Sequence, residues 1–174
     1  MPVPLLKRIK DTPLISRIRR NHGLEHATMH VLATRFPQAR LFGHSDAGGF
    51  WLVGEVPTSA VKEATTFALQ RIRNGESKLT VHAQCGTNFV TAGTLAGLAG
   101  ALSMIGSGRS IQDKLKRLPL AVTLATLSLF ISQPLGLLLQ EHLTTSANPE
   151  NLQIVEIIPT RRGRMKAHRI ITRG

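Results

Sequence analysis

The chain has 174 residues and a formal net charge of +12, with one cysteine, one tryptophan and no tyrosine. A single cysteine excludes an intrachain disulfide, and the shortage of aromatic residues makes nucleic acid a disfavoured partner. The positive charge still indicates an anionic partner, and the headgroups of anionic membrane lipids fit best.

Four elements are predicted in the first half of the chain. Residues 14–36 carry apolar side chains at helical spacing and are expected to form a helix. Two short runs of strand-forming residues then flank the glycine-containing turn 45–49, which indicates a β-hairpin. Residues 58–74 have one apolar stripe and form a second helix. Residues 78–83 are predicted to be a third strand.

Two apolar segments follow, because residues 79–108 and 118–140 contain no Asp, Glu, Lys or Arg. They predict helices at 89–105 and 118–139, joined by a basic loop. The first is rich in glycine and alanine, at a spacing that lets helices approach closely in a bilayer. The alternative is a buried helical hairpin in a soluble protein, but two adjacent charge-free segments favour the membrane.

The tail returns to soluble patterning, with predicted strands at 152–158 and 167–172 around a basic loop. The expected fold is α+β, a small mixed helix and antiparallel-sheet domain interrupted by a two-helix transmembrane hairpin. Its predicted parts are an N-terminal α+β metal-site region (1–86), the membrane hairpin (87–140) and a C-terminal β-hairpin (141–174). The last joins the soluble domain, since two spans return the chain to the same side.

The predicted location is a bacterial inner membrane or a thylakoid-type membrane, with the soluble domain in the cytoplasm. The N-terminal segment lacks the apolar core of a signal peptide, and a folded basic domain is difficult to translocate without one. A free cysteine also suits a reducing compartment. The basic loop between the apolar segments indicates the opposite orientation by the positive-inside rule, so both orientations stay open.

The residues that carry chemistry begin with His22-Gly23-Leu24-Glu25-His26, an H-x-x-E-H motif on the first predicted helix. His22 and His26 lie one turn apart, so both imidazoles can reach one metal ion. Glu25 is the predicted catalytic residue, placed to act as general base on a metal-bound water. The same letters are the zinc signature of the inverted zincin peptidases. His30 continues this face and is predicted to support the ligands from behind.

Further ligands are predicted from His82-Ala83-Gln84-Cys85, because H-x-x-C is a metal-ligand spacing. The expected cofactor is zinc or another divalent transition metal. Two helix histidines with one of His82 and Cys85 would leave a position for water, which is typical of a catalytic site. All four would complete a tetrahedron and indicate a structural site. Thr87 and Asn88 are expected to donate hydrogen bonds there, or to cap the next helix.

The strings RNHGLEHAT (20–28) and VHAQCGTNFVTAG (81–93) resemble an uncharacterised bacterial membrane-protein family, a domain of unknown function common in cyanobacteria and Chloroflexota. They are also similar to a second family, described as predicted metal-dependent membrane enzymes. The resemblance covers residues 15–140 and supplies no substrate. Ala83 stands where these families commonly have proline. The resemblance implies that the function is carried by His22, Glu25, His26, His82 and Cys85.

Two functions follow from this pattern. The leading hypothesis is a membrane-anchored, metal-dependent hydrolase, most simply a peptidase, which acts at the bilayer surface because the motif precedes the first apolar helix. The alternative is a non-catalytic accessory or assembly subunit of a membrane complex, with a structural metal site and other membrane-protein subunits as partners. The coordination shell of the metal separates the two.

Overall fold

The computed structural model describes residues 10–174, which form two compact units. The described part of unit 1 comprises residues 10–82 and 141–174, and unit 2 comprises Ala83–Gln140. Unit 2 is therefore an insertion in the sequence of unit 1.

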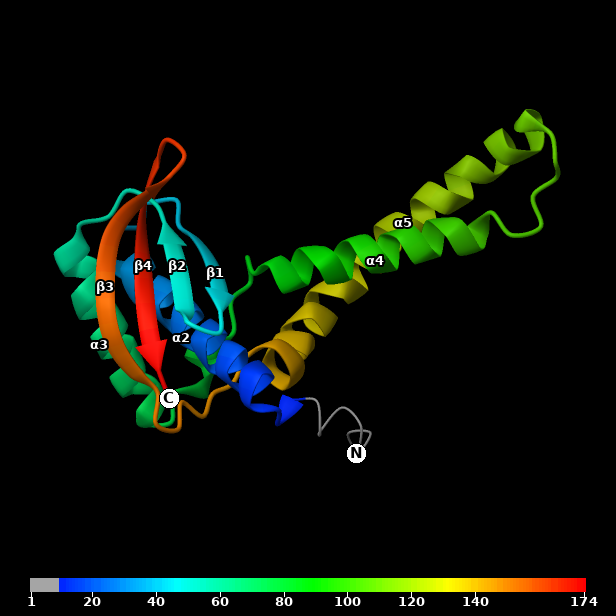
Figure 1. Ribbon diagram of the computed structural model, residues 1–174. Coiled ribbons are helices and arrows are strands. Elements are labelled where there is room, and N and C mark those ends of the chain that lie inside the picture. The colour runs from blue at the N-terminus through cyan, green and yellow to red at the C-terminus, as the bar shows by residue number, and fades with distance from the viewer. Residues whose placement is uncertain (1–9) are drawn as a thin grey trace. The chain divides into compact units, whose positions relative to one another are not determined.

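Unit 1 contains a four-stranded antiparallel sheet in the order β1-β2-β4-β3 (Figure 1). Strand β2 pairs with β4 from Gly49 and Ile171 to Val53 and Ala167. The chain before the insertion and the chain after it therefore share one sheet, which confirms the predicted α+β class. The strands are β1 Phe42–Asp46, β2 Gly49–Val53, β3 Gln153–Arg162 and β4 Met165–Arg173.

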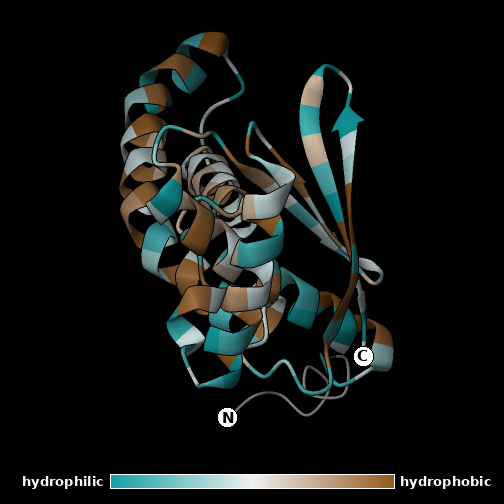
Figure 2. Cartoon of the chain, turned by 90° about the vertical axis from the view of Figure 1, so that its left-hand side faces the viewer, coloured by the Kyte–Doolittle hydropathy of each residue, from teal (hydrophilic) through white to brown (hydrophobic). Residues whose placement is uncertain are grey.

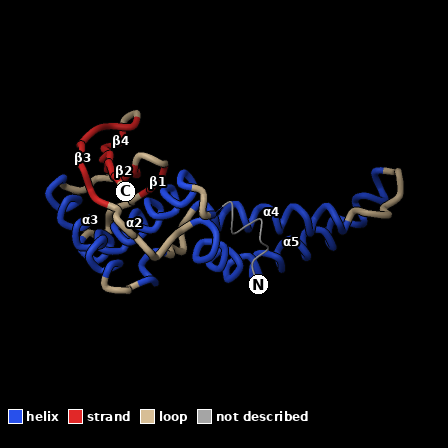
Figure 3. The backbone as a smooth tube through the Cα atoms, turned by 60° about the horizontal axis from the view of Figure 1, so that its bottom comes forward, coloured by secondary structure: helices blue, strands red, loops and turns tan. Residues whose placement is uncertain are grey.

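Two helices, α2 (Pro13–Arg35) and α3 (Thr58–Arg73), cover one face of this sheet (Figures 1 and 3). Both confirm the predicted helices, and α2 begins with proline, whose missing N–H costs nothing at a first helical position. Burying each large side chain between the helices and the sheet contributes about 1.5–3 kcal/mol. The fully buried apolar side chains include Leu24, Leu32, Phe50, Leu52, Val61, Leu152 and Ile170.

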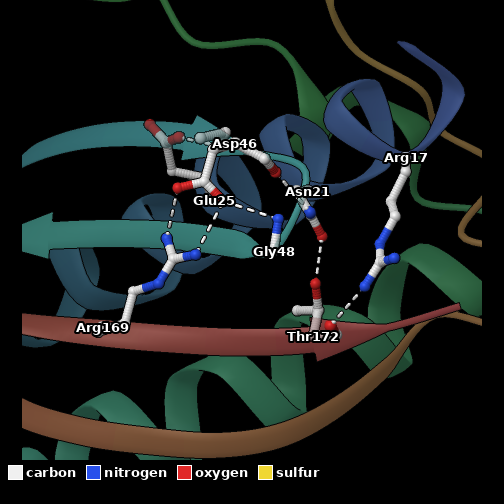
Figure 4. Close-up of polar contacts among 8 residues, drawn as sticks. Arg17, Asn21, Glu25, Asp46, Gly48, Arg169 and Thr172 are labelled. Atoms are coloured by element: carbon white, nitrogen blue, oxygen red, sulfur yellow. Dashed lines mark hydrogen bonds and ion pairs between the residues drawn. The ribbon is translucent and has the colours of Figure 1, made fainter. Parts of the chain in front are cut away.

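Polar contacts fix the N-terminal half of α2 to the sheet (Figure 4). The Asn21 amide donates to the Asp46 carbonyl at 2.8 Å and accepts from the Thr172 hydroxyl at 2.7 Å. Arg17 donates to the Thr172 carbonyl at 3.0 Å. The Asp46 carboxylate accepts two hydrogen bonds from Arg169, at 2.9 and 2.8 Å. Asn21 is fully buried, and both its amide nitrogen and its amide oxygen are hydrogen-bonded to the sheet. These directional bonds fix where α2 lies along the sheet as well as how far it lies from it.

The predicted strand at 78–83 is wrong. Residues Ser77–Thr80 form a 3-10 helix, η1, and Val81 and His82 continue as irregular chain. No strand of the described sheet pairs with this segment. Its carbonyls at Thr80 and Val81 instead meet histidine side chains of α2. The alternation of polar and apolar residues at 78–83 therefore reflects packing of this segment against helix α2, not pairing in a sheet.

Unit 2 consists of two helices, α4 (Gly86–Ser103) and α5 (Ile111–Leu139), which lie side by side (Figures 1 and 3). A short π-helix, η2 (Gln140–Thr144), follows α5. Gln140 donates to the Asn88 side chain at 2.7 Å, and Gly136 lies directly against Asn88. Close approach therefore depends on a glycine of α5. The α4 glycines do not make this contact with α5, because a Cβ would meet open space at Gly93, Gly97 and Gly100.

The predicted two-helix transmembrane hairpin is also wrong in one helix. Among the described residues, only Ile111–Thr144 forms a helix long and apolar enough to cross a membrane. Helix α4 has 18 residues, about 27 Å, and is not among the helices that meet this requirement of length and hydropathy. The long helix exposes many large apolar side chains, among them Ile111, Val122, Leu127, Phe130 and Ile131.

Candidate metal site

The histidines of α2 gather with His82 in a row of four imidazoles within unit 1. The ring centroids of His22 and His26 are 4.3 Å apart. The ring of His82 lies 5.7 Å from that of His26 and 5.0 Å from that of His30. Helix α2 supplies three of these histidines and the irregular segment after η1 supplies His82. The fold thus brings together the histidines that the sequence predicted to lie near one site.

Backbone carbonyls orient the two histidines of the motif. Nδ1 of His22 lies 3.0 Å from the Thr144 carbonyl oxygen, and Nδ1 of His26 lies 2.8 Å from that of Thr80. A carbonyl can only accept, so each neutral ring carries its proton on Nδ1 and its lone pair on Nε2. Metal-binding histidines typically have such a partner on the other ring nitrogen. Both motif histidines are therefore prepared as Nε2 ligands.

His30 takes the opposite tautomer. Its Nε2 lies 2.9 Å from the Val81 carbonyl oxygen and therefore donates to it, which leaves the lone pair on Nδ1. This bond holds the backbone immediately before His82. The predicted role of His30 as a residue that supports the ligands stays a prediction.

One ligand atom from each of His22, His26 and Cys85 lies within 4.8 Å of the other two, a group that could hold a metal ion. Zinc bonds of about 2.0–2.1 Å to nitrogen and 2.3 Å to sulfur require ligand separations of about 3.3–3.6 Å, so a modest contraction suffices. Cys85 follows His82 by three residues, and the extended chain keeps it within about 11 Å of that histidine. His82 is not part of this group, so its role as a ligand stays a prediction.

Burial keeps His26 uncharged. Desolvation and the neighbouring charge of His22 lower the pKa of His26 from 6.5 to about 3. Burial, and then the charge of His30, also lower the pKa of His82. A metal ion therefore need not displace a proton from His26 at neutral pH, which favours binding there.

Glu25 is buried on the side of α2 that faces β1 (Figure 4). Its carboxylate accepts a hydrogen bond from the Ser45 hydroxyl and lies against Gly43, where a Cβ would collide with it. Burial raises the pKa of Glu25, although the Ser45 hydrogen bond and the charge of His22 act in the opposite direction. The sequence analysis did not predict that the Glu25 carboxylate would lie against Gly43 and Ser45. The available indication was that these two residues, two apart on a strand, lie on the same face.

Gly23, the second residue of the motif, lets two backbone segments approach the helix. A Cβ there would lie 2.5 Å from the Ser146 carbonyl oxygen and 3.2 Å from a Thr80 methyl group. The Ser146 amide also donates to the Arg19 carbonyl at 3.0 Å. The segments around Thr80 and Ser146 are those that precede and follow unit 2, and the sequence pattern gave no sign that both contact α2.

Cys85 is the N-cap of α4, and the Thr87 amide donates to its sulfur at 3.4 Å. The Asn88 side chain donates to the Ala83 carbonyl at 2.6 Å and accepts from Gln140 at 2.7 Å. Cys85 therefore caps helix α4 through the Thr87 amide, and the role of Thr87 as a donor to the site stays a prediction. Asn88 fastens the base of unit 2.

Comparison with known proteins identifies one family. The family described as "Domain of unknown function (DUF6391)" matches residues 17–157, which include all eight predicted site residues. The chain is 39% identical over 150 residues to an uncharacterized protein of Picosynechococcus sp. (strain ATCC 27264 / PCC 7002 / PR-6), covering 80% of this chain and 71% of that relative. No solved structure is significantly similar to it. The resemblance to predicted metal-dependent enzymes stays a prediction, but the chain belongs to the DUF6391 family.

Proposed function

We propose that this protein is a metal-dependent hydrolase, most simply a zinc peptidase, which works at a membrane surface. The group of His22, His26 and Cys85 carries the proposal, because it could hold a metal ion and both histidines have their Nδ1 atoms on backbone carbonyls. Three protein ligands leave a fourth position for water, an arrangement typical of catalytic rather than structural zinc.

The chain's own residues can supply the rest of a hydrolytic site. A bound divalent ion would contribute Lewis acidity and activate water. Glu25 is the proposed base, which takes the proton of the attacking water and returns it to the leaving group. Ser45 and Gly43 hold its carboxylate in place. Burial raises the pKa of Glu25, which makes its carboxylate a stronger base.

Helix α5 supports the membrane setting, since it is long and apolar enough to cross a bilayer. The substrate class proposed is then a lipid or a segment of a membrane protein. We assign the protein to a bacterial inner or thylakoid-type membrane, with unit 1 on the cytoplasmic side.

A second candidate function rests on the backbone segments to which the histidines are hydrogen-bonded. His22 binds the backbone at Thr144, after unit 2, while His26 and His30 bind the backbone at Thr80 and Val81, before it. A metal ion on this helix face would then act as a clasp that fixes both connections. The protein would be an accessory or assembly subunit of a membrane complex, without catalysis of its own.

The replacement Glu25→Gln separates the two functions. Glutamine keeps the size of the side chain and can still accept from Ser45, but it cannot take a proton. We expect the zinc-loaded, full-length protein in detergent to cleave a quenched fluorogenic peptide library. E25Q should retain zinc and cleave about 10²–10⁴-fold more slowly. Glu63→Gln, an exposed residue of α3, is the matched control and should leave cleavage unchanged.

Equal cleavage by E25Q and the unchanged protein would show that Glu25 is not the base. Stoichiometric zinc with an intact library in every variant would reject the peptidase and favour the clasp. Absence of bound zinc would reject both.

A further inference from the structure

The β3–β4 hairpin extends past the rest of the sheet (Figure 1). Pairing between β2 and β4 ends at Val53 and Ala167, whereas β3 and β4 stay paired as far as Arg162 and Met165. Gly163, with φ of 60°, occupies the first central position of the two-residue turn, which is where a type II′ turn requires glycine. Residues 161–166 therefore project as a free end, here called the basic tip.

The basic tip is a concentrated positive charge. All six residues are exposed, four of them are arginine or lysine and none is acidic. Lys166 pairs with Glu55 at 2.7 Å. Among the residues that the structure describes, no carboxylate pairs with Arg161, Arg162 or Arg164. Figure 2 shows the end of the hairpin in hydrophilic colours.

An apolar side chain lies among these charges. Met165 is 55% exposed at the tip, and Val155 and Ile158 of β3 are exposed as well. Arginine and methionine together are typical of a segment that binds headgroups with its charges and the upper acyl region with its apolar group. Trp51 has the Arg162 guanidinium over its ring at 4.5 Å and that of Arg169 at 5.2 Å, so its ring is covered against base stacking. These features favour lipid over nucleic acid.

We propose that the basic tip binds the anionic phospholipid headgroups of the bilayer that holds α5. The inference rests on the membrane attachment in the proposed function, but not on catalysis. Unit 1 is joined to unit 2 at both ends, at residues 82–83 and 140–141, so any bilayer that holds α5 also has unit 1 tethered to it. Each arginine near an anionic surface contributes about a five-fold preference for binding.

Trp51 provides the test, because it is the only tryptophan of the chain and lies beneath Arg162. The full-length protein is placed in nanodiscs of phosphatidylcholine alone and of equal parts phosphatidylcholine and phosphatidylglycerol. Acrylamide quenching of Trp51 is then compared between the two discs. We expect weaker quenching in the anionic discs, with the difference removed by high salt.

A triple variant, R161Q/R162Q/R164Q, should lose about a hundred-fold in surface preference, and its quenching should be equal in both discs. The quenching of each protein is compared between the two kinds of disc. Any change that the substitutions make to the surroundings of Trp51 therefore affects both measurements equally. The matched control R40Q/K62Q/K78Q removes three exposed positive charges elsewhere in unit 1 and should keep the lipid difference.

Equal quenching of the unchanged protein in both discs, or a lipid difference that survives in the triple variant, would overturn the proposal. Binding of a single-stranded RNA oligonucleotide that needs the three arginines, without any lipid effect, would assign the tip to nucleic acid instead. A chain that stays outside discs of either lipid would refute the membrane attachment itself. Zinc content and the Glu25→Gln comparison are measured in detergent and stand apart from all these results.

Discussion

At the scale of single residues, two backbone carbonyls decide what the H-x-x-E-H histidines can do. The carbonyls of Thr144 and Thr80 place the protons of His22 and His26 on Nδ1 and direct both lone pairs to Nε2. Loss of such an outer hydrogen bond commonly costs 10–100-fold in metal affinity. The spacing of the motif supplies two ligands, but segments remote in the sequence make them usable.

Removing a motif histidine should empty the site. We expect the unchanged protein to carry one metal ion per chain and His26→Ala to carry almost none, because two remaining ligands hold zinc weakly. His44→Ala, which removes an exposed histidine of β1, is the control. Metal analysis by mass spectrometry of the purified proteins makes the comparison, and equal metal in H26A and H44A would disprove the assignment.

His168 should make the stability of the metal-free protein depend on pH. It is buried in β4 with its Nε2 3.0 Å from the Thr58 hydroxyl, and burial lowers its pKa below 6.5. Between pH 6.5 and that lowered pKa the unfolded chain binds a proton that the folded chain does not, so stability falls as the pH falls. His168→Gln should flatten this part of the profile.

Urea unfolding of the two chelator-treated proteins from about pH 8 to pH 5 measures the difference. His26 contributes with the same sign in both proteins, and Glu25, whose pKa is raised, contributes with the opposite sign in both. The difference between the two profiles therefore isolates His168. Parallel profiles would show that its titration is not coupled to folding.

At the scale of elements, α2 is a platform for backbone that comes from far along the chain. Gly23 makes this contact close, since a Cβ would meet Ser146 and Thr80. Helix propensity alone predicts that Gly23→Ala would stabilise by about 1 kcal/mol. We expect the collision to win, with a net loss of about 1–2 kcal/mol and weaker metal binding, because the Thr80 carbonyl that orients His26 is displaced.

Gly97→Ala is the matched control, since that position of α4 faces open space. It should be neutral or raise stability by up to about 1 kcal/mol. Denaturant unfolding and zinc titration of both variants provide the measurement. If G23A is as stable as the unchanged protein and binds zinc equally well, the two segments do not press on the helix.

Apolar periodicity was enough to predict α2 and α3, because each buries one face against the core. The first hairpin was predicted instead from its glycine-containing turn and the strand-forming residues around it. Periodicity failed at 78–83, where the partner of the backbone is a row of histidine side chains rather than a strand. For the site, the one-turn spacing of His22 and His26 was visible in the sequence. The contact of the Glu25 carboxylate with Gly43 and Ser45 was not visible in the sequence, because it depends on how α2 crosses β1.

At the scale of the whole molecule, the sheet restricts how the chain can meet a membrane. Strand β2 comes before unit 2, β4 comes after it, and the whole of β2 is paired with β4. Both ends of unit 2 must therefore lie on the same side of any bilayer. If helix α5 crosses the bilayer, the rest of unit 2 must therefore bring the chain back to the side from which it entered.

Cysteine labelling tests this restriction. In a Cys85→Ser background, Ser77→Cys and Asn148→Cys place one thiol before unit 2 and one after it, both at exposed positions. We expect an impermeant maleimide to label both from the same side of sealed vesicles, and from the cytoplasmic side if the proposed orientation is right. Labelling from opposite sides would contradict the shared sheet.

The central claim is a metal site with an open position, formed by His22, His26 and Cys85. X-ray absorption at the zinc edge of the purified, full-length protein tests it most directly. We expect two imidazole nitrogens at about 2.0–2.1 Å, one sulfur at about 2.3 Å and one oxygen that the protein does not supply. A shell of four protein ligands would make the site structural, and a shell without sulfur, or a protein that binds no zinc, would contradict the account.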